Sequence, residues 1–305
     1  MSETSIHPTA IVDRSVHLGE GVKVGAFSII GPETVLGDRV AIGAHVELGA
    51  QNPLDASPPS KNSDGPIHIG ADCVVGSQVI VSGQVDVGAH VRVGHGTILS
   101  GPMTIGKGSN IFDLTVVGGA GQYPGNHRFD GRIEIGENVT VRELVLIHKP
   151  VLTASTVIED GCYLMSRTQI DHDCHLERRV KTACGVTLGG SVHIGEFAYL
   201  GMNAVVHQGI HVGAHTMVGM NSAVTKHVPP FAMLVKNAFT KINRSGLELR
   251  RMSSAQIAAI EAFYTASTPL AQNSGEKDAA LRLIEAFYSA TKGAPVFKPE
   301  FSRKD

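Results

Sequence analysis

Tryptophan is absent from this 305-residue sequence, and all aromatic residues together make up only 5% of it. Glycine, in contrast, occurs 35 times, and valine and isoleucine are spread evenly along most of the chain. This composition is typical of a repetitive β solenoid rather than of a mixed α/β enzyme. With 42% apolar residues, the chain can still bury a sizeable core without crosslinks.

The sequence also lacks an excess of charge of either sign. Its formal net charge is −2, its pI is about 6.7, and it contains no block of like charges. We therefore expect no nucleic-acid partner. No segment approaches the roughly 20 apolar residues of a membrane-spanning helix, and the N-terminus has no basic region followed by an apolar run. We expect a soluble, cytoplasmic protein without a transmembrane segment.

Only four cysteines occur, and none of them belongs to a CxxC pair. Cys73, Cys162, Cys174 and Cys184 lie inside the repeats described next, at positions where a small apolar side chain suits a core. We interpret all four as packing residues, and we predict no disulfide and no cofactor.

An aliphatic residue recurs at every sixth position over most of the chain. The period runs from Ile6 to Leu48, from Ile69 to Val117, from Ile135 to Ile147 and from Ile158 to Val224, where only Thr182 is not aliphatic. An amphipathic helix would repeat every 3.6 residues and an ordinary strand every two. A strict period of six predicts a three-sided prism of parallel strands, with about 18 residues per coil and a rise of ~4.8 Å per coil.

The repeats predict a parallel β-helix over residues 1–228. The phase of six is broken at about 50–66, 119–131 and 149–156, which we interpret as loop insertions. Loops on a rigid scaffold are frequent positions for binding groups.

Residues 229–305 are predicted to form a small α-helical domain. Apolar residues have helical spacing in the segments 253–267 and 277–291, and Ser253 and Ser254 are candidate N-caps for the first of these helices. We interpret residues 271–276 as the linker between the two helices.

Because one coil takes three hexapeptides, aliphatic positions three repeats apart stack on one face of the prism. Counting places five of them on the same face: Val117, Ile147, Ile170, Leu188 and Val206. The residues beside them therefore meet at one edge: Gln122 in a Gly-rich loop, His148, Asp171, His172, Asp173, Gly190, Ser191, His207 and Gln208.

His172 is the strongest candidate for chemistry among the 15 histidines, because a carboxylate flanks it on each side. A carboxylate bonded to one ring nitrogen fixes the tautomer and raises the basicity of the other nitrogen, as a general base for a sugar hydroxyl or amine requires. We expect this side chain at an outer corner of the prism, where a substrate can reach it.

Three histidines on such a scaffold could instead bind zinc. His148, His172 and His207 fall on coils about 5 and 10 Å apart along the axis. This spread is too large for three ligands at about 2 Å from one metal. We therefore predict no metal site in a single chain.

Five runs of sequence resemble the acyl-carrier-protein-dependent UDP-N-acetylglucosamine O-acyltransferases of lipid A biosynthesis, in order and in spacing. The runs are VRELVLIHK (141–149), IDHDC (170–174), GMNAVVHQGIHVGAH (201–215), VPPF (228–231) and INRSGLELRR (242–251). The resemblance extends from residue 6 to about 265. It implies a left-handed β-helix, a homotrimer with each cleft between two subunits, and transfer of an acyl or hydroxyacyl group from acyl carrier protein to a nucleotide sugar.

The same resemblance implies roles for individual residues. His172 is the catalytic base and Asp173 is its orienting carboxylate. Asn243 and Arg250 match positions that bind the nucleotide part of the acceptor. Arginine suits a phosphate because its guanidinium offers a planar fork of hydrogen-bond donors. The remaining predicted substrate-binding residues are Gln122, His148, Gln169, Gly190, Ser191, His207 and Gln208.

The chain departs from the family at some of these positions. Family members usually have QDLKY where this chain has Gln122 followed by YPGN, and two cleft histidines are replaced by Gln169 and Ser191. These departures favour a modified acceptor, such as an amino-sugar analogue, over plain UDP-N-acetylglucosamine.

Two alternatives stay open at the level of sequence. An acyl-coenzyme A-dependent short-chain sugar N- or O-acetyltransferase would have the same fold but no apolar slot for a long acyl chain. A non-catalytic solenoid scaffold would have no use for an edge with adjacent histidine and aspartate residues. Acyl chain length, the nucleotide sugar and O- versus N-transfer are open as well.

Overall fold

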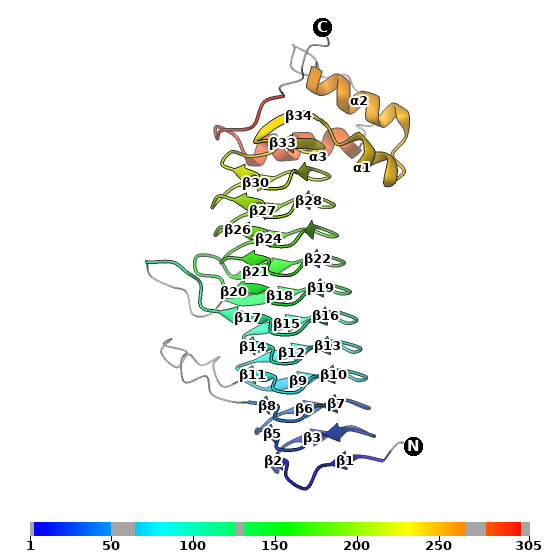
Figure 1. Ribbon diagram of the computed structural model, residues 1–305, viewed down its shortest axis with the longest axis vertical. Coiled ribbons are helices and arrows are strands. Elements are labelled where there is room, and N and C mark those ends of the chain that lie inside the picture. The colour runs from blue at the N-terminus through cyan, green and yellow to red at the C-terminus, as the bar shows by residue number, and fades with distance from the viewer. Residues whose placement is uncertain (1–2, 50–64, 126–130, 266–278, 300–305) are drawn as a thin grey trace.

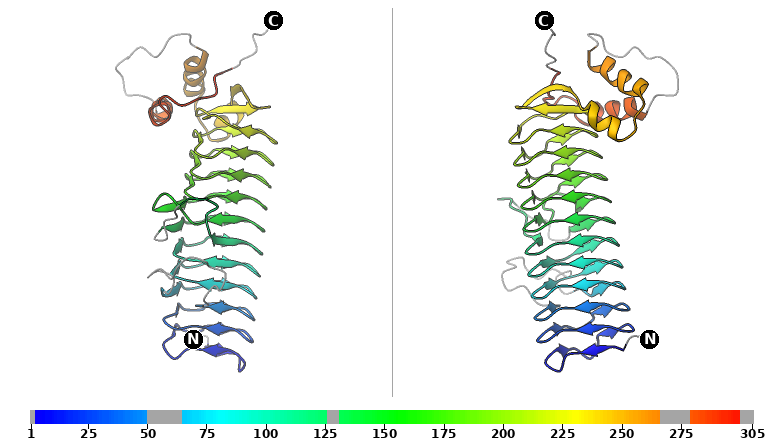
Figure 2. Two further views of the ribbon diagram at one scale, coloured as in Figure 1. Left: turned by 90° about the vertical axis from the view of Figure 1, so that its left-hand side faces the viewer. Right: turned by 45° about the vertical axis from the view of Figure 1, so that its right-hand side comes forward.

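The computed structural model describes residues 3–49, 65–125, 131–265 and 279–299. These residues form a column of stacked coils, with the N-terminal strands at one end and three helices at the other (Figure 1). The two further views show the same stack, with the helices confined to the end that follows β31 (Figure 2). Most of the insertion predicted at 50–66, part of that at 119–131 and the linker at 271–276 lie outside the described residues.

Each coil contributes one strand to each of three sheets, and successive coils pair in parallel. The first sheet has 13 strands: β1 (Ser5–Ile6), β4 (Lys23–Val24), β7 (Ala41–Ile42), β10 (Val74–Val75), β13 (Arg92–Val93), β16 (Asn110–Ile111), β19 (Thr140–Val141), β22 (Tyr163–Leu164), β25 (Lys181–Thr182), β28 (Tyr199–Leu200), β31 (Met217–Val218), β33 (Ala232–Val235) and β34 (Ala238–Ile242). The second sheet has 11: β2 (Ile11–Val12), β5 (Ile29–Ile30), β8 (Glu47–Leu48), β11 (Ile80–Ser82), β14 (Ile98–Ser100), β17 (Val116–Gly119), β20 (Leu146–His148), β23 (Gln169–Ile170), β26 (Thr187–Leu188), β29 (Val205–Val206) and β32 (Ala223–Val224). The third has 10: β3 (His17–Leu18), β6 (Val35–Leu36), β9 (Ile67–Ile69), β12 (Val85–Val87), β15 (Met103–Ile105), β18 (Arg132–Ile135), β21 (Ser155–Ile158), β24 (His175–Leu176), β27 (His193–Ile194) and β30 (His211–Val212).

The aliphatic residue of each repeat points into the column. Leu99 and Ile147, for example, are at most 1% exposed, and burial of one such side chain contributes about 1.5–3 kcal/mol. Thr182, the exception in the repeat, is also fully buried, and its hydroxyl is 2.9 Å from that of Thr168. This hydrogen bond satisfies a polar group that would otherwise be unpaired in the core. The period of six therefore predicted the three-sided parallel architecture correctly.

Most turns between strands contain one residue in the left-handed conformation. Asp173 (φ 62°) and Ser191 (φ 59°) are examples in neighbouring coils. The Ser191 amide donates a 2.8 Å hydrogen bond to the carbonyl of His172, so each turn is fixed by the turn before it. The corners are consequently rigid columns of stacked turns, suited to holding side chains in place.

The C-terminal part adds β33 in parallel to β31, β34 antiparallel to β33, and the helices α1 (Arg244–Leu249), α2 (Ser254–Thr265) and α3 (Ala279–Ala290). The two helices expected from sequence are confirmed as α2 and α3. Ser253 caps α2 as predicted, because its hydroxyl accepts a hydrogen bond from the Gln256 amide while the Gln256 side chain accepts one from the Ser253 amide. The division at residue 228 stays a prediction, and the first sheet continues to Ile242.

No helix within the described parts of the chain has the length and apolar character needed to cross a membrane.

Candidate functional site

Most of the predicted site residues lie along one corner of the column, between the second and third sheets. The register pairs Val117 with Ile147, Ile147 with Ile170, Ile170 with Leu188 and Leu188 with Val206, which confirms the stacking counted from sequence. We call the turns that follow these five positions, together with the adjoining strand residues His148 and Gln169, the site corner: the described parts of 119–131, then 149–154, 171–174, 189–192 and 207–210.

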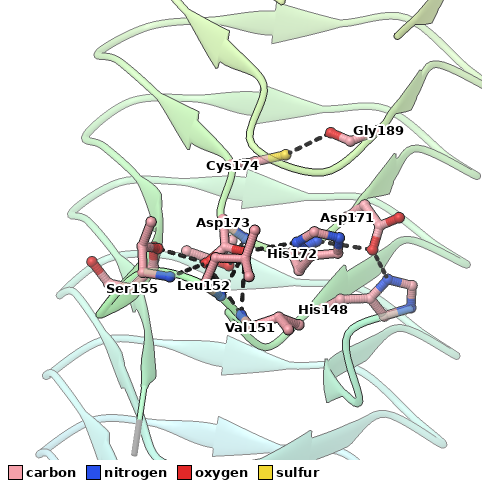
Figure 3. Close-up of polar contacts among 11 residues, drawn as sticks. His148, Val151, Leu152, Ser155, Asp171, His172, Asp173, Cys174 and Gly189 are labelled. Atoms are coloured by element: carbon pink, nitrogen blue, oxygen red, sulfur yellow. Dashed lines mark hydrogen bonds and ion pairs between the residues drawn. The ribbon is translucent and has the colours of Figure 1, made fainter. Parts of the chain in front are cut away.

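A histidine–aspartate pair forms the centre of the site corner (Figure 3). His172 Nδ1 lies 2.7 Å from Oδ2 of Asp173, and both residues are buried. The Asp173 side chain is completely shielded from solvent. The structure thus contains the contact that the resemblance implied, and the roles of His172 as base and Asp173 as orienting carboxylate stay predictions.

The turn at 149–156 surrounds the Asp173 carboxylate with donors. Backbone amides of Val151, Leu152 and Thr153 and the Thr153 hydroxyl all donate to it, at distances from 2.6 to 3.3 Å. Burial raises the pKa of the Asp173 carboxyl, but hydrogen bonds from Thr153, His172 and Leu152 outweigh this effect and hold the pKa below its usual value.

An ionised Asp173 has no proton to donate, so Nδ1 of His172 must carry the proton in their hydrogen bond. When the imidazole is neutral, the other ring nitrogen, Nε2, has a free lone pair. A neutral imidazole held in this tautomer can take a proton from a hydroxyl or an amine and be stabilised as imidazolium by the carboxylate. The site can therefore perform general-base chemistry.

Two glycines allow the chain to pass close to the His172 ring. A Cβ on Gly190 would overlap the imidazole, and one on Gly121 would lie 3.0 Å from the His172 Cβ. The Tyr123 ring also packs against the imidazole in an edge-to-face arrangement, with 5.6 Å between centroids. His172 is at the predicted corner but only 6% exposed. The expectation that a substrate can reach His172 at an open outer corner was therefore wrong for the single chain, because the loop after β17 covers the ring.

A second histidine–aspartate pair lies beside the first. Nδ1 of His148 is 3.0 Å from Oδ1 of Asp171, and the same oxygen accepts a 2.9 Å hydrogen bond from the His172 amide. His148 is 7% exposed. Both histidines therefore belong to one polar cluster within the site corner.

The other predicted residues of this corner lie around the cluster. Gln122 is exposed on the loop after β17, and Gln169 is half-buried on β23. Ser191, His207 and Gln208 are exposed on the two coils that follow His172. The arrangement places a set of exposed polar groups next to the buried pair.

Asn243 and Arg250 lie elsewhere in this chain. Arg250 donates to the Phe197 carbonyl at 2.7 Å, and its guanidinium lies 5.3 Å from the centroid of the Phe197 ring. Phe197 is in a turn between the third and first sheets, stacked on His215 of the next coil. We call this column of turns the Phe197 corner. Asn243 caps α1 and donates to the His215 carbonyl. A whole sheet width thus separates these residues from the site corner.

Sequence reasoning did not select Thr153 or Tyr123 as site residues, and it placed Asp171 at the shared edge without assigning it a role. Thr153 belongs to an insertion that follows Ile147, directly one coil before Ile170. An insertion at a stacked position was a usable signal that its residues would contact Asp173. For Tyr123 the sequence carried no comparable indication, because the loop path has no periodicity.

The described residues contain no group of three or more His, Cys, Asp or Glu side chains placed to hold a metal ion. Cys73, Cys162 and Cys174 are buried in the core and Cys184 is half-buried, and all four are free thiols.

The fold and the histidine–aspartate corner define a class of proteins, the hexapeptide-repeat transferases with a left-handed parallel β-helix. The family model for "bacterial transferase hexapeptide (six repeats)" matches residues 15–50, and that for "hexapeptide repeat of succinyl-transferase" matches 66–100 and 191–226. A solved UDP-N-acetylglucosamine acyltransferase from Campylobacter jejuni has the same fold, with a TM-score of 0.64 at 22% identity over 96% of this chain and all of that one.

Curated relatives narrow the class to one family. An acyl-(acyl-carrier-protein)–UDP-N-acetylglucosamine O-acyltransferase of Burkholderia vietnamiensis is 30% identical over 206 residues, which span 62% of this chain and 79% of that protein. The enzyme of the same name from Herminiimonas arsenicoxydans is 30% identical over 166 residues, which span 52% of this chain and 62% of that protein. This chain belongs to the acyl-(acyl-carrier-protein)–UDP-N-acetylglucosamine O-acyltransferase family.

Proposed function

We propose that this protein transfers an acyl group, specifically a hydroxyacyl group, from the thioester of acyl carrier protein to a nucleotide sugar, with His172 as general base. The observation that carries the proposal is the 2.7 Å contact of His172 with a buried, fully hydrogen-bonded Asp173. Family membership supports the donor and the acceptor class, because the relatives are named for both.

The reaction follows from the free lone pair on Nε2. His172 takes the proton of the acceptor nucleophile while the nucleophile attacks the thioester carbonyl. The new O–C or N–C bond forms and the C–S bond breaks, so the carrier leaves as a thiolate. The imidazolium then returns its proton to that thiolate, which leaves the carrier as a free thiol and the base restored.

The acceptor is proposed to be an amino-sugar analogue of UDP-N-acetylglucosamine. Gln169 and Ser191 stand where the family has histidines, while His172 and Asp173 keep their geometry. An amine is a stronger nucleophile than a hydroxyl, so its attack depends less on the histidines that Gln169 and Ser191 replace.

A panel of nucleotide sugars tests this choice of acceptor. Each would be assayed with one acyl-carrier thioester and, in parallel, with acyl-coenzyme A, and His172→Ala protein would give the background rate. We expect the amino-sugar nucleotide to have the highest kcat/KM. A tenfold preference for plain UDP-N-acetylglucosamine, or ~1.4 kcal/mol of transition-state binding, would contradict the choice of acceptor. A preference for acyl-coenzyme A would contradict the donor.

We also propose a homotrimer in which the Phe197 corner of one subunit lies against the site corner of the next. The outer face of the second sheet supports this, because Leu146 is 36% and Val205 is 49% exposed there. In this arrangement Arg250 reaches a neighbour's nucleotide, and Asn243 holds the helix that carries Arg250.

The trimer predicts a sedimentation mass of about three times 32.1 kDa at micromolar protein. Sedimentation equilibrium over a range of concentrations would measure it. A stable monomer under these conditions would remove the intersubunit cleft and with it the proposed role of Arg250.

A further inference from the structure

The relation between the two histidine–aspartate pairs is the observation from which a further role follows. Asp171 lies beside both histidines, with its carboxylate directed toward the His148 ring and the His172 main chain (Figure 3). Its Oδ1 atom accepts both the His172 amide at 2.9 Å and Nδ1 of His148 at 3.0 Å. The Asp171 side chain is 15% exposed and that of His148 is 8% exposed, so water competes little for this contact.

We propose that Asp171 is a positioning residue that holds His148 with the proton on Nδ1 and an unprotonated Nε2. This inference rests on the proposed function, because it assigns His148 a role in binding the acceptor. A carboxylate only accepts hydrogen bonds, so the pairing selects this tautomer. The Gly119 backbone passes the ring at the Cδ2–Nε2 edge, where a Cβ would lie 3.1 Å from Cδ2.

The consequence concerns the chemical class of the acceptor. His172 and His148 each bind an aspartate through Nδ1, so each keeps its Nε2 lone pair as a hydrogen-bond acceptor. The site corner thus offers two imidazole acceptors and requires donors from the substrate. A sugar with an amino group beside a hydroxyl supplies them, and one whose nearby groups are only carbonyl or ether oxygens does not.

Asp171 also links the His148 ring to the main chain of His172. One oxygen atom of Asp171 contacts the His148 side chain, 23 residues earlier in the sequence, and the main chain of the adjacent His172. Loss of that oxygen would free the His148 ring, whereas His172 would keep its separate contact with Asp173. The two tautomers should therefore respond differently to the same substitution.

Nitrogen NMR of full-length protein labelled at histidine side chains tests the proposal without substrate. The His148 and His172 signals would be assigned from the variants His148→Ala and His172→Ala. In the wild type we expect a single Nδ1–H tautomer for both. In Asp171→Ala the single-tautomer signature of His148 should be lost, while that of His172 should stay.

The matched control is Asp86→Ala. Asp86 lies on the third sheet, where its carboxylate is 2.8 Å from Nδ1 of His68 and both side chains are exposed. This variant should leave the His148 signal unchanged. If Asp171→Ala does not fold, Asp171→Asn serves instead, because its amide can donate to Nδ1 and should produce the other tautomer. An unchanged His148 tautomer in the folded variant, or an Nε2–H tautomer in the wild type, would overturn the proposal.

Steady-state kinetics provide a second test once an acceptor has been identified. Asp171→Ala should raise the KM of the acceptor by roughly two- to tenfold, the range of one net hydrogen bond, with a smaller change in kcat. A fall in kcat at constant KM would contradict a binding role for His148. The NMR result does not depend on activity, so failure of this positioning role can be told apart from failure of the proposed function.

Discussion

Replacement of His172 by alanine should reduce kcat by about 10²–10⁴-fold, the usual loss when a general base is removed. The fold should be retained, because the ring lies at a turn and not among the inward aliphatic residues of the column. Steady-state kinetics with an acyl-carrier thioester, together with circular dichroism and sedimentation, would measure both effects.

His175→Ala is the matched control for this variant. His175 lies on β24, the strand that directly follows the turn of His172. Its side chain is 39% exposed, and it is bonded to Glu159 instead of to a buried aspartate. Its removal should leave turnover close to that of the wild type. If His172→Ala retained more than a third of wild-type turnover, the assignment of the base would be wrong.

A single methyl group on Gly190 should reduce activity almost as much. The backbone of Gly190 passes close to the His172 ring, and a Cβ there would overlap its Cε1, Nε2 and Nδ1 atoms. The methyl group must push the imidazole away from Asp173 or out of the cleft. Misplacement of a catalytic group by about 1 Å can cost on the order of 10²-fold in rate. We therefore expect at least that loss of kcat in Gly190→Ala.

The double variant Gly190→Ala/His172→Ala separates this effect from general damage. If the methyl group acts only through the ring, adding it to His172→Ala should cause no further loss of kcat. Because Gly190 is not among the residues with positive φ, alanine should be tolerated by its backbone. Fully additive losses, or a lowered unfolding midpoint of Gly190→Ala in the His172→Ala background, would show that the glycine serves the fold instead.

The stacking of the site corner was predictable because the repeat is local. One hexapeptide per side makes residues three repeats apart neighbours, so the column from Val117 to Val206 could be counted without a structure. The same count brought His148 and His172 to one edge. It could not show that His172 is buried, because the loop through Tyr123 that covers it has no period.

The contact of Asp171 with His148 and that of Asp173 with the Thr153 turn were equally beyond the sequence. Asp171 and Asp173 differ little in their sequence neighbourhood, yet one binds His148 and the other binds His172 and the Thr153 turn. The resemblance grouped Arg250 with the cleft residues, whereas in one chain it lies at the Phe197 corner.

By itself the sequence determined the three-sided β-helix, the face shared by the site residues, and the helices α2 and α3. The β-helix and the shared face follow from the period of six, and the helices follow from the period of 3.6. Local backbone geometry imposes both periods. Only the tertiary structure decided which nitrogen of each histidine is bonded, how Asp173 is kept charged, and which corner Arg250 occupies. The physical reason is that, apart from the contact between the neighbours His172 and Asp173, these features depend on contacts of aperiodic turns with residues 20 or more positions away, as between Thr153 and Asp173.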